Sequence, residues 1–201
     1  MKTLYALFLG TAAIACLSLP SAGEPGTPDS APAIDSTGKL AFPANYREWV
    51  FLSSGLDMSY SPDAAMAEQH MFNNVFVPRA AFEAFLKSGT WPDGTVLMLE
   101  NRSAATNQSI LKHGQIQTNE VVGLSAHVKD SRLKGGWAFY SFDADQKPAK
   151  EIPHDAPCYS CHQAHAAVDT TFVQFYPTLL PVAITMHTLS ASYLAESRSK
   201  H

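Results

Sequence analysis

The chain has 201 residues, of which 46% are apolar and 16% are charged, and its formal net charge is −4. This length is enough to bury one hydrophobic core rather than two, and the composition is that of a folded chain and not of a disordered one. The negative net charge excludes a basic protein that binds nucleic acid through electrostatic attraction.

The first 23 residues are typical of an export signal. Lys2 gives a minimal basic start, the stretch LYALFLGTAAIACLSL is apolar, and SAG supplies small residues for cleavage near Gly23. The apolar run is interrupted by Gly10 and Thr11 and is short for a stable membrane span. We therefore predict a cleaved signal peptide over residues 1–23, a periplasmic or otherwise exported protein, and no membrane span after cleavage. A retained anchor is the alternative.

Residues 24–38, EPGTPDSAPAIDSTG, are rich in Pro, Ser and Gly and contain little that a core would bury. This composition predicts a flexible linker. The stretch LAFPANYREWVFL then brings aromatic and apolar side chains, so we predict one folded domain over residues 39–197.

Alternating segments follow in this domain. HMFNNVFV (70–77) is rich in aromatic and β-branched residues and predicts a strand that ends at Pro78. RAAFEAFLKSG (79–89) has apolar residues at helical spacing and a glycine stop, which predicts a helix. TVLMLE (95–100) predicts a second strand after the WPDG turn.

Two more strands are predicted at VVGLSAHVKD (121–130) and WAFYSFDAD (137–145), where the short LKGG connection favours an antiparallel pair. A short helix is expected to carry the stretch APCYSCHQAH (156–165), and another helix is expected near residues 182–196. Strands joined by short turns, with helices inserted and appended, predict an α+β fold with a mainly antiparallel sheet.

The stretch APCYSCHQAH (156–165) contains two cysteines and two histidines close together, which are candidates for binding a cofactor or a metal. Cleavage of the signal peptide removes Cys16, which leaves Cys158 and Cys161 as the cysteines of the mature protein. Four uses of the pair are open: a disulfide, a redox dithiol, a zinc site and covalent haem. Cys16 itself is read as a small apolar residue of the signal, with lipoprotein processing as the alternative.

Three of these uses fit the chain poorly. A disulfide between residues three apart closes a small loop and constrains little of the unfolded chain. A catalytic dithiol normally lies near the start of a strand–helix–strand unit, and here the pair follows antiparallel strands. A zinc site would use His154, His162 or His165 beside the cysteines, but a structural site usually takes a second pair of ligands from a distant segment.

Covalent haem uses every residue of the motif. The pattern C-x-x-C-H is the attachment signature of c-type haem, in which both thiols bond to the porphyrin. Cys158 and Cys161 share one helix face at this spacing, and His162 can reach the iron as an axial ligand. We therefore predict one covalently bound haem c, held by Cys158 and Cys161, with His162 on the iron.

Five stretches carry a resemblance to a known family: NYREWVF, GTWPDGTVLMLE, AHVKD, GWAFYSFD and CYSCHQAHAAVDTTFVQFYPTLL. From about Asn45 to Leu180 the chain resembles the cytochrome P-460 and cytochrome c-prime-beta family. The resemblance implies an antiparallel-sheet haem protein with a five-coordinate iron, an open distal side and often a homodimer.

One position separates the chemistries of that family. The members with the P-460 chromophore oxidise hydroxylamine and crosslink a lysine to the porphyrin, and the matching position here is Leu99. Lys87 and Lys112 are the nearest lysines, but neither falls on the matching strand position. The resemblance therefore argues against hydroxylamine oxidation.

The cytochrome c-prime-beta branch caps the distal face of the haem with apolar side chains. By this resemblance we expect Leu99, together with Phe72 or Phe76, to line the distal pocket. The alternative is that these residues are ordinary core. Strand alternation puts Phe72 and Phe76 on one face and turns Glu100 away from Leu99, so Glu100 is not expected to act as a catalytic base.

Three functions are consistent with these observations. The first is binding of a small gaseous or nitrogenous ligand such as NO or CO in an apolar distal pocket. The second is a haem oxidoreductase, acting on hydroxylamine or NO or as a peroxidase, which would need a distal acid–base group. The third is electron transfer to a redox partner protein, with a sixth ligand on the iron. Candidates for that ligand are His70, His113, His127, His154, His165, His187, Met58, Met66, Met71, Met98 and Met186.

Overall fold

The structure is a computed structural model that describes residues 33–60 and 70–199. The predicted signal peptide (1–23), the linker up to residue 32, and Met66 lie outside the described residues. The described end of the linker forms a turn in which Ile34 makes an isolated bridge to Leu40. Among the described residues, no helix is long and apolar enough to cross a membrane.

The fold is α+β with a mainly antiparallel sheet, as the sequence predicts. Five strands form the main sheet in the order β2-β3-β4-β5-β6, and every neighbouring pair is antiparallel. A two-stranded sheet pairs β1 with β7. The strands are β1 (Lys39–Leu40), β2 (Val50–Leu56), β3 (Met71–Val77), β4 (Val96–Ala105), β5 (Ile116–Lys129), β6 (Trp137–Phe142) and β7 (Ala149–Lys150).

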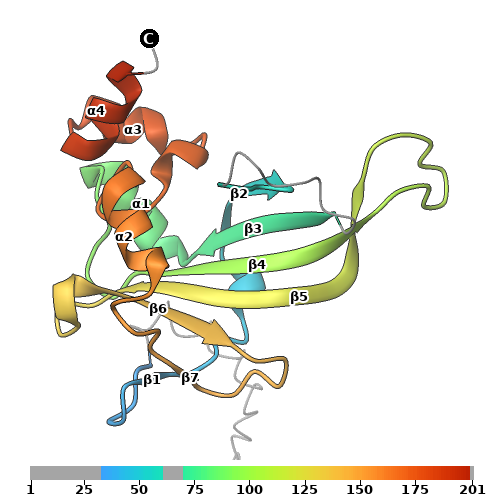
Figure 1. The fold of residues 1–201 in the computed structure, drawn as a ribbon, viewed down its shortest axis with the longest axis horizontal. Helices are drawn as coiled ribbons and strands as arrows, with labels where there is room; N and C mark the ends of the chain where they lie inside the picture. The colour runs from blue at the N-terminus through green and yellow to red at the C-terminus, as the bar shows by residue number, and fades with distance from the viewer. Residues whose placement is uncertain (1–32, 61–69, 200–201) are drawn as a thin grey trace, which may run out of the picture.

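The helices gather over one end of the main sheet, and the long β4–β5 hairpin extends from the other end (Figure 1). They are α1 (Arg79–Ser88), α2 (Pro157–His165), α3 (Leu180–Thr185) and α4 (Ala191–Ser199), with 3-10 turns η1 (Tyr46–Glu48), η2 (Lys134–Gly136) and η3 (Val173–Phe175). Helix α2, which carries both cysteines, therefore lies at this end.

The strands and the helix predicted between residues 70 and 145 are confirmed. Helix α1 begins after Pro78 and ends at Gly89, whose φ of 73° is the left-handed conformation that glycine adopts without a steric penalty. Strands β4 and β5 extend beyond their predicted bounds toward the hairpin tip. The single C-terminal helix predicted over residues 182–196 is wrong, because the chain turns at His187 (φ 55°) and two short helices form instead.

Two hydrophobic cores lie on the two faces of the main sheet, so the single core expected from the chain length is wrong. The first core joins the sheet to the helices and contains Phe85, Trp91, Leu97 and Leu179. The second core lies on the other face and contains Leu40, Tyr46, Met98 and Tyr140. The sheet thus has a helix-covered face and an opposite face.

Candidate functional site

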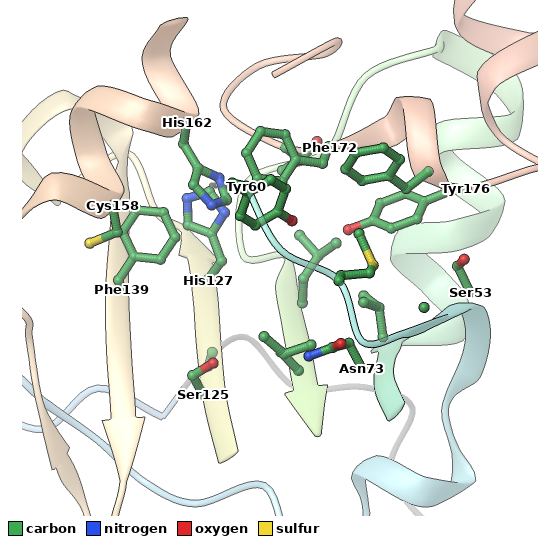
Figure 2. Close-up of a pocket in the computed structure, with 18 of the residues that line it drawn as sticks. Ser53, Tyr60, Asn73, Ser125, His127, Phe139, Cys158, His162, Phe172 and Tyr176 are labelled. Atoms are coloured by element: carbon green, nitrogen blue, oxygen red, sulfur yellow. The ribbon is translucent and has the colours of Figure 1, made fainter. Parts of the chain in front are cut away.

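A cavity of about 350 Å³ lies between the helix-covered face of the sheet and the segment 171–176, which follows helix α2. Its volume is within the range of small-molecule and cofactor sites. Figure 2 shows Asn73 and Ser125 on the sheet side, Phe172 and Tyr176 on the opposite side, and His162 at one end. The lining is mainly apolar, and it includes Val75, Leu97, Leu99, Phe139, Ile152 and Phe175.

Helix α2 places the predicted attachment motif at this cavity. The helix begins at Pro157, whose missing N–H costs nothing in the first helical turn. Cys158 and Cys161 follow, and both are half-buried free thiols. Cys158 and His162 line the cavity. The helix predicted for the motif is confirmed, and it brings the three motif residues to one place.

The imidazole of His162 has a defined proton position. Its Nδ1 lies 2.7 Å from the carbonyl oxygen of Thr170, and a carbonyl can only accept, so Nδ1 carries the proton and Nε2 carries the lone pair. Burial lowers the pKa of His162, and the hydrogen bond to Thr170 opposes that shift only partly. The neutral ring is the form that can bind a metal.

Aromatic rings hold His162 in place. The ring of Phe172 lies 4.1 Å from it between centroids, and the ring of Phe139 lies 4.7 Å away at a steep angle. Contact on these sides restricts rotation of the imidazole, so its Nε2 is kept in one direction.

His127 on β5 is a second histidine of this site, and no local sequence pattern distinguishes it from the other histidines. It is buried, it stacks on Phe139 at 3.9 Å, and its ring stands edge-on to His162 at 5.1 Å. Its Nε2 lies 3.2 Å from the hydroxyl of Thr170. Burial, and then the neighbouring His162, keep the pKa of His127 well below its ordinary value. His127 is therefore a neutral, packed neighbour of His162.

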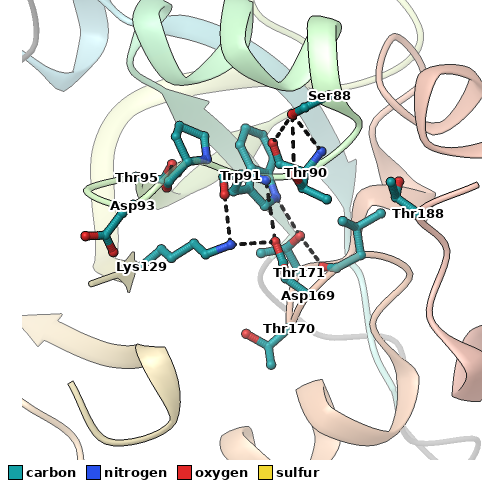
Figure 3. A network of polar contacts seen from close by, with 12 residues as sticks. Ser88, Thr90, Trp91, Asp93, Thr95, Lys129, Asp169, Thr170, Thr171 and Thr188 are labelled. Atoms are coloured by element: carbon teal, nitrogen blue, oxygen red, sulfur yellow. Dashed lines mark hydrogen bonds and ion pairs between the residues drawn. The ribbon is translucent and has the colours of Figure 1, made fainter. Parts of the chain in front are cut away.

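Thr170 belongs to a four-residue turn, Val168 to Thr171, that polar contacts fix to the sheet end (Figure 3). Lys129 donates to the carbonyl of Trp91 at 2.8 Å and to the Asp169 carboxylate at 3.1 Å. The indole N–H of Trp91 donates to the hydroxyl of Thr171 at 2.8 Å. The turn is thus anchored on both sides of Thr170.

The structure places the predicted distal residues on different faces of the sheet. Leu99 lines the cavity, and its partner in the register is Val75, which also lines it. Phe76 pairs with Met98 and packs on the second core, while Phe72 pairs with Arg102. The expectation that Phe72 or Phe76 joins Leu99 in one pocket is therefore wrong, because strand alternation gives the cavity Asn73 and Val75 instead.

Most of the other candidate ligands are placed away from the cavity. His70 pairs with Asp57, His154 with Glu151, and His165 with Glu196. Among the described methionines, Met58 alone lines the cavity, and the described cavity lining contains no lysine. Lys87 and Lys112 are exposed.

These residues fit a covalently bound haem. Two thiols at helical spacing stand beside a neutral histidine whose Nε2 is the free nitrogen, and the adjoining cavity is mainly apolar. A metal-binding histidine usually donates its other ring N–H to a carbonyl or carboxylate oxygen, as Nδ1 of His162 does here to Thr170. Cys158, Cys161 and His162 are the residues that would hold the group.

Comparison with known proteins gives one family. The sequence model of the family described as Cytochrome P460 matches residues 43–173, which is more than half of the chain and includes the cavity-lining strands and helix α2. A search of curated proteins found no match to the chain.

Proposed function

The chain belongs to the cytochrome P460 family, whose members are c-type haem proteins, and from this premise we propose that it is an exported cytochrome with one covalent haem c. In this proposal Cys158 and Cys161 bond the porphyrin, and His162 is an axial ligand of the iron. The signal peptide predicted at residues 1–23 supports export, and haem c is attached outside the cytoplasm in bacteria.

The observation that carries this proposal is the bond from Nδ1 of His162 to the carbonyl of Thr170. It assigns the lone pair to Nε2 at the wall of a mainly apolar cavity. His162 is half-buried at that wall, and a ring nitrogen with a free lone pair is suited to bind a metal. His162 would hold the iron of a bound haem through that nitrogen, and the haem would supply a site for a small ligand in the cavity.

We propose a neutral diatomic molecule, NO or CO, as that ligand. Leu99, Leu97 and Val75 give the cavity an apolar wall, which favours uncharged molecules over anions. The position that matches the crosslinking lysine of hydroxylamine-oxidising relatives is Leu99, and no described cavity-lining residue supplies an amine in its place. Both points favour ligand binding over hydroxylamine oxidation.

A six-coordinate electron carrier is the second candidate, and Met58 favours it. The thioether of Met58 lines the cavity and packs against Gly55 so closely that a Cβ on that glycine would lie 1.9 Å from Sδ. A methionine there could serve as a sixth ligand. We propose a five-coordinate iron as the resting state because the thioether already has a packing partner.

The test is an absorption spectrum of the mature, reduced protein before and after CO is added. A high-spin ferrous spectrum that shifts with CO supports the proposal. A low-spin spectrum that ignores CO overturns the open site in favour of the carrier, and a red-shifted band of the P-460 type brings back the oxidoreductase. The absence of a Soret band overturns the haem assignment.

Variants of helix α2 provide the matched control. The double variant Cys158→Ala with Cys161→Ala should lose covalent haem in a denaturing haem stain, whereas Ser160→Ala, on an exposed turn of the same helix, should keep it. The mass of the mature protein tests cleavage near Gly23. Light scattering of the holoprotein tests the homodimer that the family resemblance implies.

A further inference from the structure

Thr170 connects two histidines from distant parts of the chain. Its carbonyl oxygen accepts from Nδ1 of His162 at 2.7 Å, and its hydroxyl lies 3.2 Å from Nε2 of His127. One residue therefore contacts the predicted iron ligand with its backbone and the neighbouring histidine with its side chain. A displacement of either contact moves the other.

His127 is a rigid support for this contact. It projects from β5 near the end of that strand, where it pairs with Leu97 of β4 and with Phe139 of β6. Its ring is stacked nearly parallel on Phe139, at an interplanar angle of 11°, and lies 4.4 Å from Trp137. A side chain that packs on both sides in this way has little freedom to follow a moving partner.

The turn around Thr170 is fixed by other contacts. Asp169 accepts from Lys129, and Thr171 accepts from the indole of Trp91. Backbone hydrogen bonds between Val168 and Thr171 close the turn. In addition to these contacts, the hydroxyl contact to His127 ties Thr170 itself, whose carbonyl accepts from His162, to the sheet.

We propose that His127 and Thr170 are positioning residues that set how strongly His162 donates electrons to the haem iron. The inference rests on the proposed function, because it concerns His162 as an axial ligand. A firm bond from Nδ1–H to a carbonyl makes the imidazole more basic at Nε2 and strengthens its bond to a metal. By holding the Thr170 carbonyl in place, the His127 contact keeps this bond short.

The expected effect has a definite sign. When the hydroxyl contact is removed, Thr170 is held only through its neighbours Asp169 and Thr171. Its carbonyl then shifts, the Nδ1–H···O bond lengthens, and His162 becomes a weaker donor. A weaker donor stabilises ferric iron less, so the reduction potential of the haem rises. The iron–histidine stretching frequency of the ferrous protein falls in parallel.

Thr170→Val is the decisive variant, because it keeps the backbone carbonyl and the β-branched shape and removes only the hydroxyl. Thr170→Ser keeps the hydroxyl and is the matched control. In haem-loaded holoprotein we expect a higher potential and a lower iron–histidine frequency in Thr170→Val, and values near those of the wild type in Thr170→Ser. An unchanged potential and frequency in Thr170→Val would overturn the inference.

His127→Phe tests the same contact from the other side, since it keeps an aromatic ring for Phe139 and removes Nε2. It should shift both readouts in the same direction as Thr170→Val, and the double variant should shift them no further than the larger single effect. Fully additive shifts would show that the two residues act separately and would overturn the inference. A wild-type protein without covalent haem would overturn the proposed function itself, whereas normal haem loading with unresponsive variants overturns only this inference.

Discussion

The two faces of strand β4 are built in opposite ways. On one face Leu97 and Leu99 line a cavity and leave space beside them. On the other face Glu100 is buried and accepts from Tyr46, Arg102 and other donors, so that its oxygens are fully used. On the face of Glu100 the protein's own donors occupy the carboxylate, whereas on the other face a mainly apolar cavity has room for a ligand.

The Glu100 network shows how a buried charge is accommodated. Both oxygens of the carboxylate accept from Arg102, at 2.7 and 2.9 Å, and Arg47 and Asn74 donate at 2.7 and 3.2 Å. These donors come from η1, β3 and β4, so the network ties the segment before β2 to the sheet. The Glu100 network therefore stabilises its own face of the sheet, whereas the cavity on the helix-covered face is suited to ligand binding.

The largest effect should follow from loss of the Glu100 charge. Glu100→Gln leaves Arg102 buried without its counter-charge, and removal of one partner from a buried pair typically costs about 3–5 kcal/mol. We expect a loss of about that size in urea unfolding with covalent haem content unchanged. Glu120→Gln, at an exposed carboxylate on β5, should change the free energy of unfolding by less than about 0.5 kcal/mol. Equal losses of unfolding free energy in Glu100→Gln and Glu120→Gln would show that the buried Glu100 network adds no stability beyond that of an exposed carboxylate.

The same carboxylate predicts how stability depends on pH. Burial alone would raise the pKa of Glu100, but hydrogen bonds from Arg102, Tyr46 and Asn74 outweigh it and lower the pKa from 4.5 to about 2. A pKa that is depressed in the folded state gives stability that is complete above the unfolded value and lost as the pH falls toward the folded one. This shift corresponds to about 3 kcal/mol.

Comparison of wild type with Glu100→Gln isolates that contribution, because the cavity face is the same in both proteins. Between pH 4.5 and pH 2.5 the wild type should lose more stability than the variant, so the difference between their free energies of unfolding should narrow. A difference that stays constant over this range would show that Glu100 titrates normally.

The sequence predicts the elements of this fold better than it predicts which face each residue uses. Periodicity gave β3, α1 and β4, and alternation correctly turned Glu100 away from Leu99. Alternation does not say which face of the sheet α2 covers. The prediction that Phe72 or Phe76 lies on the cavity face is wrong for this reason. The register of Val75 opposite Leu99 was needed to decide it.

Polar contacts between distant segments could not be predicted from the sequence either. The partners of Glu100 include Tyr46, which is 54 residues away, and the partner of His127 is Thr170, 43 residues away. No local pattern marks such pairs, because hydrogen bonding between distant segments depends on how the sheet is assembled. The motif C-x-x-C-H, in contrast, can be recognised in the sequence, because haem attachment requires its residues to be neighbours along the chain.

Adjacent positions on β4 give the sharpest test of the two faces. Met98 is fully buried on the second core, and Leu99 is half-buried at the cavity. Met98→Ala should cost about 3 kcal/mol and leave CO association unchanged, since it creates a void in a closed core. Leu99→Ala should cost only about 1–2 kcal/mol, because one side of Leu99 already adjoins open space, and it should speed CO association. A change of CO kinetics in Met98→Ala alone would reverse the assignment of the faces.

The smallest effect on stability is expected at Met58, where the cavity opens to solvent. The residue is 37% exposed, so Met58→Ala should cost less than about 1 kcal/mol. With a five-coordinate iron, the reduced spectrum should be the same in Met58→Ala and in Met186→Ala, an exposed methionine outside the cavity. A change from a low-spin to a high-spin spectrum in Met58→Ala alone would identify Met58 as the sixth ligand. A side chain of the protein would then occupy the ligand position at the cavity, as side chains of the protein occupy the oxygens of Glu100 on the opposite face.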